Sequence, residues 1–131
     1  MLHFTAWPDF GVPGAGRVGE ILVAARRIIR ESSPCRQPAS TSDIPPVIVH
    51  CSAGVGRSGV YIAADLLLSS RVSIDTGKIK DSTAVSKEEV VNMVGKMRCF
   101  RDGMVQTQEQ FDCIGQSVKD AIDIIQSGGL S

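Results

Sequence analysis

The sequence predicts an α/β domain in which about four helices flank a fragment of a sheet. Apolar residues recur at helical spacing in four long segments, and a short run at 46–50 has the continuous β-branched pattern of a strand buried on both faces. The 131 residues suffice for one domain, residues 1–131, and a hydrophobic content of 43% is that of a globular protein rather than a disordered one.

The N-terminal part predicts a loop followed by a helix. The segment 2–6 is short and apolar, and it is a candidate second strand. Prolines and glycines make 8–16 a loop. A helix is expected over 17–32, with three arginines, Arg26, Arg27 and Arg30, on its solvated face. Its apolar face would consist of Val18, Ile21, Leu22, Ala25, Ile28 and Ile29.

The middle of the chain predicts a loop, a strand and a second helix. The stretch 32–46 is rich in Ser, Pro, Thr and Gln, as in a linker-like loop. The strand 46–50 leads through a glycine-bearing turn into a helix expected over 57–69. The polar stretch 70–85 is expected to be a loop.

Two capping patterns predict the last helices. Ser86 and Glu89 match a capping box before a helix that runs to about Phe100 and buries Val90, Val91, Val94 and Met97. Thr107 and Gln110 form a second possible box before a helix to about Gln126. One convincing strand cannot satisfy its own backbone groups, so the chain resembles part of an α/β domain whose other strands lie outside it.

Composition and cysteine spacing exclude several function classes. Fourteen basic and fourteen acidic residues cancel, so no broad field favours nucleic acid, and no apolar run is long enough to span a membrane. The N-terminus lacks the pattern of a signal peptide. The cysteines, at 35, 51, 99 and 113, contain no Cys-x-x-Cys pair, and there are two histidines, which makes a zinc site unfavourable. We therefore expect no metal or cofactor, and reduced thiols in an intracellular compartment.

The segment 50–59 predicts an anion cradle. A strand ends, Gly54 and Gly56 permit an unusual turn, and a helix begins, so that backbone N–H groups and the positive helix end converge on one point. Cys51 would lie at the floor of this cradle with a lowered pKa. Arg57 can bind two oxygens of a phosphate through its planar guanidinium.

Other interpretations of this segment remain open at this point. Cys-x5-Arg alone is a weak pattern, and a cysteine after an apolar strand is commonly a core residue. The strand before, the glycines within and the helix after favour the phosphate site. A nucleotide-binding P-loop is disfavoured because Gly-x4-Gly-Lys-Ser/Thr is absent.

Three motifs together resemble the protein tyrosine phosphatases, in the phosphotyrosine-specific, cysteine-based branch. HCSAGVGRSG at 50–59 is similar to the phosphate loop of that family, WPDFGVP at 7–13 to its mobile acid loop, and MVQTQEQF at 104–111 to its glutamine loop, 106–110. The resemblance covers the C-terminal half of the family's catalytic domain. It implies a partial tyrosine phosphatase fold, a fragment of a twisted mixed sheet with about four helices.

The resemblance also implies residue roles. Cys51 would be the nucleophile, Asp9 the general acid and base, and Gln106 the residue that positions the hydrolytic water. Ser58 would aid breakdown of the intermediate. His50 and Trp7 would support the loops. The substrate phosphate would be bound by Ser52, Ala53, Gly54, Val55, Gly56, Arg57 and Gln110. Gln110 could equally be the capping partner of Thr107, and His50 could equally be a hydrogen-bonded residue at the end of a strand.

The expected function is hydrolysis of phosphotyrosine in proteins through a cysteinyl-phosphate intermediate. The alternative is a truncated, weak or inactive fragment that binds phosphotyrosine or a partner. A rhodanese-like sulfur transferase also uses a cysteine loop, but it does not explain the other two motifs. We expect phosphotyrosine-containing proteins as partners, and a cytoplasmic location, either as a soluble protein or as the intracellular part of a longer receptor.

Overall fold

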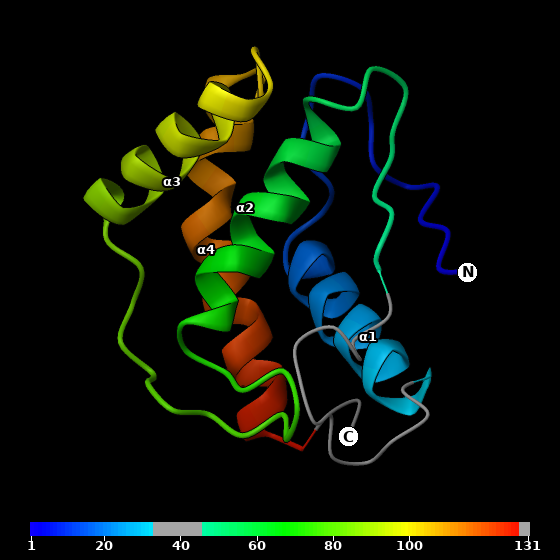
Figure 1. The fold of residues 1–131 in the computed structure, drawn as a ribbon, viewed down its shortest axis with the longest axis vertical. Coiled ribbons are helices and arrows are strands. Elements are labelled where there is room, and N and C mark those ends of the chain that lie inside the picture. Colours follow the sequence, from blue (N-terminus) through cyan, green and yellow to red (C-terminus); the bar gives the residue numbers. More distant parts are fainter. Residues whose placement is uncertain (33–45, 129–131) are drawn as a thin grey trace.

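The computed structural model describes residues 1–32 and 46–128, which contain four helices (Figure 1). They are α1 (Arg17–Ser32), α2 (Arg57–Ser69), α3 (Lys87–Phe100) and α4 (Gln108–Gln126). All four predicted helices are confirmed. The linker-like loop predicted at 32–46, and Cys35 within it, lie almost wholly outside the described residues.

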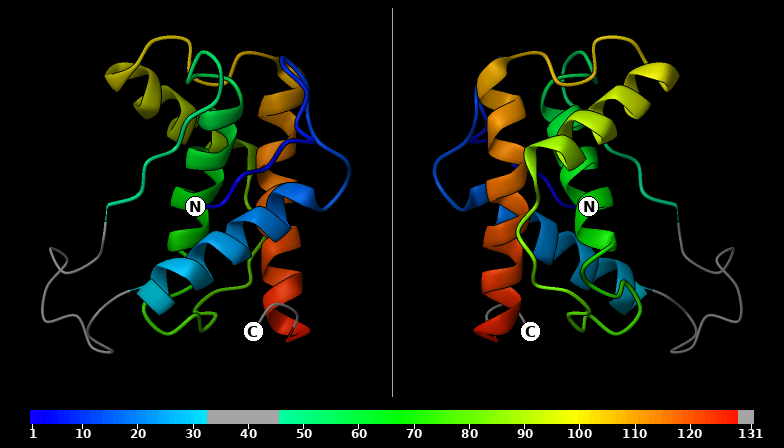
Figure 2. Two further views of the ribbon diagram at one scale, coloured as in Figure 1. Left: turned by 90° about the vertical axis from the view of Figure 1, so that its right-hand side faces the viewer. Right: turned by 90° about the vertical axis from the view of Figure 1, so that its left-hand side faces the viewer.

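Helix α4 forms the centre of the packing and contacts α1, α2 and α3. Its residues Ile114, Val118 and Ala121 are fully buried, as are Leu22 of α1 and Val60 of α2. Figure 2 shows α1 crossing α4 at a steep angle. Gly19 makes this crossing possible, because a Cβ there would lie 2.7 Å from the Cβ of Asp120. The core is therefore built mainly by helix faces, to which Trp7, Val72, Met104 and Val105 add buried side chains from outside the helices.

Side-chain caps fix where α3 and α4 begin. At α3, the Ser86 hydroxyl accepts a bond from the Glu89 N–H at 3.2 Å, and the Glu89 carboxylate accepts one from the Ser86 N–H at 2.8 Å. The predicted capping box is therefore confirmed. At α4, Thr107 accepts from the Gln110 N–H, but the Gln110 side chain bonds elsewhere, so the second box is only half formed.

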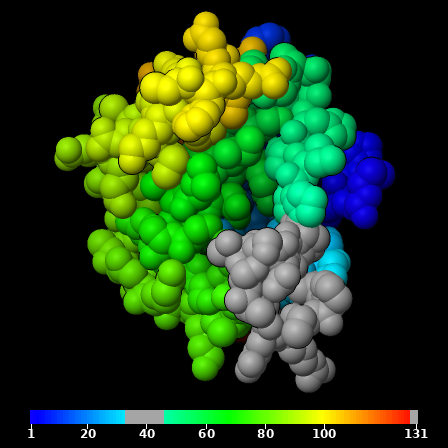
Figure 3. Space-filling view, viewed as in Figure 1, coloured from blue at the N-terminus to red at the C-terminus, as the bar shows by residue number. Residues whose placement is uncertain are grey.

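The predicted sheet is wrong. The described residues contain no strand, and their only β-type pairing is an isolated bridge between Val72 and Ile79 in the predicted loop 70–85. The run 46–50, expected to be buried on both faces, lies on the outside in Figure 3, with Val47 52% and Ile48 89% exposed. The segment 2–6 is also irregular. A β-branched run forms a strand only against a neighbour, and the described chain supplies none.

Arg26 was wrongly placed on a solvated face. It is 3% exposed and donates to the Asp65 carboxylate at 2.9 Å, to the Asp65 carbonyl at 2.8 Å and to the Ser69 hydroxyl at 2.6 Å. These acceptors belong to α2, so Arg26 joins α1 to α2. Burial of a guanidinium is tolerated here because its donors are satisfied. Val91, expected to be inward, is 49% exposed.

None of the helices in the described part of the chain is long and apolar enough to cross a membrane.

Candidate functional site

The three predicted loops meet at one end of the helix bundle, the upper end in Figures 1 and 2. Arg57 donates from Nη1 to the Trp7 carbonyl at 3.0 Å, which joins the phosphate loop to the acid loop. The Val105 N–H donates to the Val55 carbonyl at 2.9 Å and joins the phosphate loop to the chain before the glutamine loop. Residues far apart in the sequence are thus connected directly.

The phosphate loop curls around the Cys51 sulfur and ends in α2. Gly54 has a φ of +74°, a left-handed conformation that glycine adopts without strain, and its N–H donates to Cys51 Sγ at 3.2 Å. Arg57 is the first residue of α2. The turn therefore places the sulfur at the positive end of a helix, where an anion is favoured.

This environment lowers the pKa of Cys51. Burial opposes ionisation, but the Ser58 hydroxyl and the N–H groups of Ser58 and Gly54 favour the thiolate more strongly, with a smaller contribution from the Arg57 charge. The pKa falls from 9.0 to about 7. Ser58 is 3% exposed, and its hydroxyl has no hydrogen-bond partner of regular geometry among the described residues, so its effect on the sulfur is that of a looser polar contact. A larger share of the Cys51 side chains is then ionised at neutral pH than for an ordinary cysteine.

Asp9 and Ser52 bind the Arg57 guanidinium. Arg57 Nη2 forms an ion pair with Asp9 Oδ1 and donates to the Ser52 hydroxyl at 2.8 Å. Ser52 in turn donates to Asp9 Oδ1 at 3.0 Å. The Asp9 side chain is 59% exposed, whereas that of Arg57 is 23% exposed. The exposed Asp9 carboxylate therefore accepts from the solvent-facing side of the Arg57 guanidinium.

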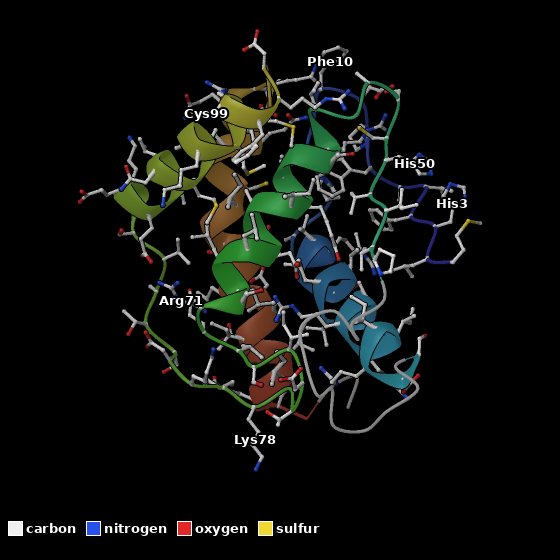
Figure 4. All side chains as sticks on the ribbon, in the orientation of Figure 1. His3, Phe10, His50, Arg71, Lys78 and Cys99 are labelled. Carbon is white, nitrogen blue, oxygen red and sulfur yellow. The ribbon has the colours of Figure 1, made fainter. Side chains whose placement is uncertain are left out.

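The acid loop is anchored by its tryptophan. Trp7 is 8% exposed, contacts Phe4 edge to face, and donates from Nε1 to the Gly11 carbonyl at 3.0 Å. Phe10, between the two ends of this bond, has a φ of +56° and a 67% exposed side chain, which is labelled in Figure 4. The indole thus closes the loop and holds Asp9 at its exposed tip.

Gln106 and Gln110 lie against the phosphate loop in different ways. Gln106 is exposed, and its side-chain amide occupies the space where a Cβ on Gly56 would be. Gln110 is fully buried, accepts from the Gln106 N–H at 2.9 Å and donates to the Gly11 carbonyl at 3.2 Å. Gln110 therefore links the glutamine loop to the acid loop, a position that the cap interpretation did not foresee.

Sequence reasoning missed two arginines at the end of α3. Arg98 donates from Nε to the Met104 carbonyl and from Nη2 to the Val105 carbonyl, both at 2.9 Å. Arg101 donates to the Ala53 carbonyl of the phosphate loop at 3.1 Å. Basic residues in the last turn of a helix are ordinarily explained by the helix dipole, so the sequence held no signal for these contacts.

The structure does not bring every predicted residue to the cradle. His50 is exposed and makes no hydrogen bond to Cys51 within the part of the chain described; Figure 4 labels it on the extended segment before the cradle. Cys99 is exposed, and Cys113 is partly buried. No cluster of three or more His, Cys, Asp or Glu side chains among residues 1–32 and 46–128 could hold a metal ion.

A separate shallow hollow of about 370 Å³ lies between the segment 84–90 and α4. Its lining residues belong to none of the three loops, and they include no cysteine or histidine. Its charged lining residues are Lys87, Asp112 and Lys119, and the hollow is separate from the cradle.

Comparison with known proteins identifies the family of this chain. The family model for protein-tyrosine phosphatase matches residues 1–120. The chain is 36% identical over 127 residues to the human receptor-type tyrosine-protein phosphatase eta, covering 97% of this chain and 8% of that protein. It is 37% identical over 122 residues to the mouse protein of that name, covering 93% of this chain and 8% of that protein.

The receptor-type tyrosine-protein phosphatase S of Gallus gallus is 35% identical over 122 residues, covering 93% of this chain and 7% of that protein. The chain thus spans less than a tenth of the length of these curated relatives. Because the family model and the relatives match almost all of it, the chain belongs to the protein-tyrosine phosphatase family.

Proposed function

We propose that this chain hydrolyses phosphotyrosine in proteins through a phosphate ester of Cys51. The observation that carries the proposal is the position of the Cys51 sulfur, at the N-terminal end of α2, with the Gly54 N–H at 3.2 Å and a pKa of about 7. A thiolate in an anion cradle is a nucleophile suited to phosphorus.

In the first step the Cys51 thiolate attacks phosphorus. An S–P bond forms, and the bond between phosphorus and the tyrosine oxygen breaks. Arg57 and the backbone N–H groups of 52–57 bind the phosphoryl oxygens as charge shifts onto them. Asp9 gives its proton to the departing phenolate oxygen.

In the second step water attacks the phosphorus of the intermediate. Gln106 orients that water, and the Asp9 carboxylate accepts its proton. The S–P bond breaks, inorganic phosphate leaves, and the Cys51 thiolate returns. The Ser58 hydroxyl stabilises the departing thiolate, in keeping with its effect on the pKa of Cys51.

The ion pair between Asp9 and Arg57 is exchanged when substrate binds. Arg57 Nη2 already donates to both Asp9 Oδ1 and the Ser52 hydroxyl, so a phosphate oxygen that binds this nitrogen must displace an acceptor, and the exposed Asp9 carboxylate is the one that can move away. A phosphate in the cradle therefore releases Asp9, whose exposed side chain is then free to reach the leaving oxygen. The acid loop thus responds to the same guanidinium that binds the substrate.

Turnover of a phosphotyrosyl peptide by the purified chain tests the proposal. We expect Cys51→Ser to abolish turnover, because a neutral hydroxyl cannot replace the thiolate. We expect Asp9→Ala to lower kcat by about 10²–10⁴-fold while the peptide still binds. Equal turnover by wild type and Cys51→Ser would overturn the assignment of the nucleophile.

A binding function is the second candidate, and the absence of strands in residues 1–32 and 46–128 favours it. No strand of the described residues then supports the loops, and catalysis requires reacting groups to be held to within about 0.5 Å. A chain that binds the phosphotyrosyl peptide, and loses it on Arg57→Ala, but shows no turnover would be such a module. Phosphotyrosine-containing proteins are the proposed partners in both cases. The expectations of no cofactor and of a cytoplasmic location stay predictions.

A further inference from the structure

A strained residue lies immediately before the glutamine loop. Val105 has a φ of +65° and is 2% exposed. A left-handed conformation is rare for a β-branched residue, because its Cβ substituents crowd the backbone, and such strain persists only where neighbouring groups impose it. Something in the surroundings must therefore hold Val105.

Two sets of contacts hold both sides of this residue. Its N–H donates to the Val55 carbonyl at 2.9 Å, and this approach depends on Gly59, where a Cβ would lie 2.7 Å from the Val105 nitrogen. Its carbonyl accepts from Arg98 Nη2 at 2.9 Å, while Arg98 Nε binds the preceding carbonyl, that of Met104, also at 2.9 Å.

The strained conformation determines where Gln106 lies. Gln106 follows Val105 directly, its N–H donates to Gln110 Oε1 at 2.9 Å, and its side chain packs against Gly56 in the cradle. An extended or helical Val105 would point the next residue in another direction. The guanidinium of Arg98 thus fixes the peptide from which the Gln106 backbone starts.

We infer that Arg98 is a positioning residue for the second step of the reaction: its two bonds hold Val105 in the left-handed conformation and thereby hold Gln106 against the phosphate loop. The inference rests on the proposed function for its kinetic consequence, but not for its structural one. The alternative is that Arg98 only complements the dipole of α3. That alternative predicts no change confined to Val105 and Gln106.

Amide hydrogen exchange separates these alternatives without requiring turnover. In Arg98→Ala we expect exchange at the Val105 and Gln106 amides to accelerate by about tenfold or more, because two charge-assisted bonds are lost, while exchange in α1 and α4 stays as in wild type. Lys96→Ala removes a cation from the same helix at an exposed position and should leave both amides unchanged. Unchanged exchange at 105 and 106 in Arg98→Ala, or equal acceleration throughout the chain, would overturn the inference.

Pre-steady-state kinetics with p-nitrophenyl phosphate tests the consequence for catalysis. Gln106→Ala and Arg98→Ala should both lower kcat and release a burst of about one p-nitrophenol per chain, because the first step outpaces the second. Arg98→Lys should fall between wild type and Arg98→Ala, since an ammonium lacks the fork that binds two carbonyls.

The outcomes distinguish the two proposals. A burst in Gln106→Ala but none in Arg98→Ala overturns the inference and leaves the proposed function standing. No burst in either variant overturns the role of Gln106, and no turnover in wild type overturns the proposed function. In both of these cases amide exchange still decides whether Arg98 holds Val105.

Discussion

Replacing Gly56 with alanine should separate catalysis from folding. The backbone at Gly56 has a φ of −76° and a ψ of −81°, close to the right-handed helical region, so the change introduces little conformational strain. A Cβ there would overlap the Gln106 side-chain amide, 3.1 Å from its Cδ, and would lie 3.2 Å from Gln110 Nε2. Gln106 is exposed and can rotate away, whereas Gln110 is fully buried and bonded at both ends of its amide.

The expected effect is therefore large on turnover and small on stability. Displacing Gln106 by about 1 Å or more should cost about 10²-fold in kcat through loss of water orientation. Because the displaced atoms are the end of a flexible side chain, the free energy of unfolding should change by no more than about 1 kcal/mol. The loss falls on the second step, so a burst of p-nitrophenol should precede the slow steady state.

Stopped-flow absorbance and thermal melting measure the two effects in one preparation. Gly95→Ala is the matched control: it lies inside α3, and a Cβ there meets no atom within 4 Å. It should raise the free energy of unfolding by about 0.5–1 kcal/mol and leave kcat unchanged. The reasoning is refuted if Gly56→Ala unfolds the chain, or if it turns over at the wild-type rate.

Three further predictions concern single side chains. The rate at which iodoacetate alkylates Cys51 should follow an ionisation near pH 7. Burial raises the pKa of Cys113 to about 11, so Cys113 should stay unmodified at pH 8. Mass spectrometry measures both, and equal labelling of the two thiols would contradict the assigned environments. Arg26→Ala should lower the free energy of unfolding by about 2–4 kcal/mol, because the partly buried Asp65 loses its partner. Arg27→Ala removes an exposed pair with Glu31 and should lower it by about 0.5 kcal/mol or less. Urea denaturation measures both, and similar losses would refute the argument that burial makes the Arg26 pair the more important one. The Ser86 N–H and then Arg71 lower the pKa of Glu89 in the folded protein below its ordinary value, so the charge of Glu89 stabilises the fold above the ordinary pKa, and this stability is lost as pH falls through the folded-state pKa. Glu89→Gln should therefore be less stable than wild type at pH 7, with a difference that shrinks below about pH 4. A stability difference independent of pH would disprove the linkage.

The helices could be predicted from the sequence because their determinants are local. Ser86 and Glu89 lie three residues apart, and the buried faces of α2 and α4 repeat at helical spacing. The sheet could not be predicted correctly, since a strand forms only where another segment pairs with it, and the composition of one segment does not reveal whether that partner is present. The run 46–50 has the composition of a strand, but within the described residues it has no neighbour to pair with.

In the candidate site, too, the residues with local determinants could be predicted and those with distant contacts could not. Cys51 and Arg57 are joined by one turn and a helix start, so their spacing in the sequence already indicated a shared cradle. Arg98 and Val105 carried no such signal: the first has the pattern of an ordinary helix-end cation, and a left-handed valine is unexpected from composition. The buried Arg26 was misplaced for a related reason, because its acceptors lie on another helix.

The most direct measurement is the mass of the chain after brief reaction with a phosphotyrosyl peptide and rapid denaturation at alkaline pH, which stops turnover. The proposed chemistry predicts one added phosphoryl group on the peptide that contains Cys51, more of it in Gln106→Ala, and none in Cys51→Ser. A phosphoryl group on another residue, or peptide hydrolysis that persists in Cys51→Ser, would contradict the proposal.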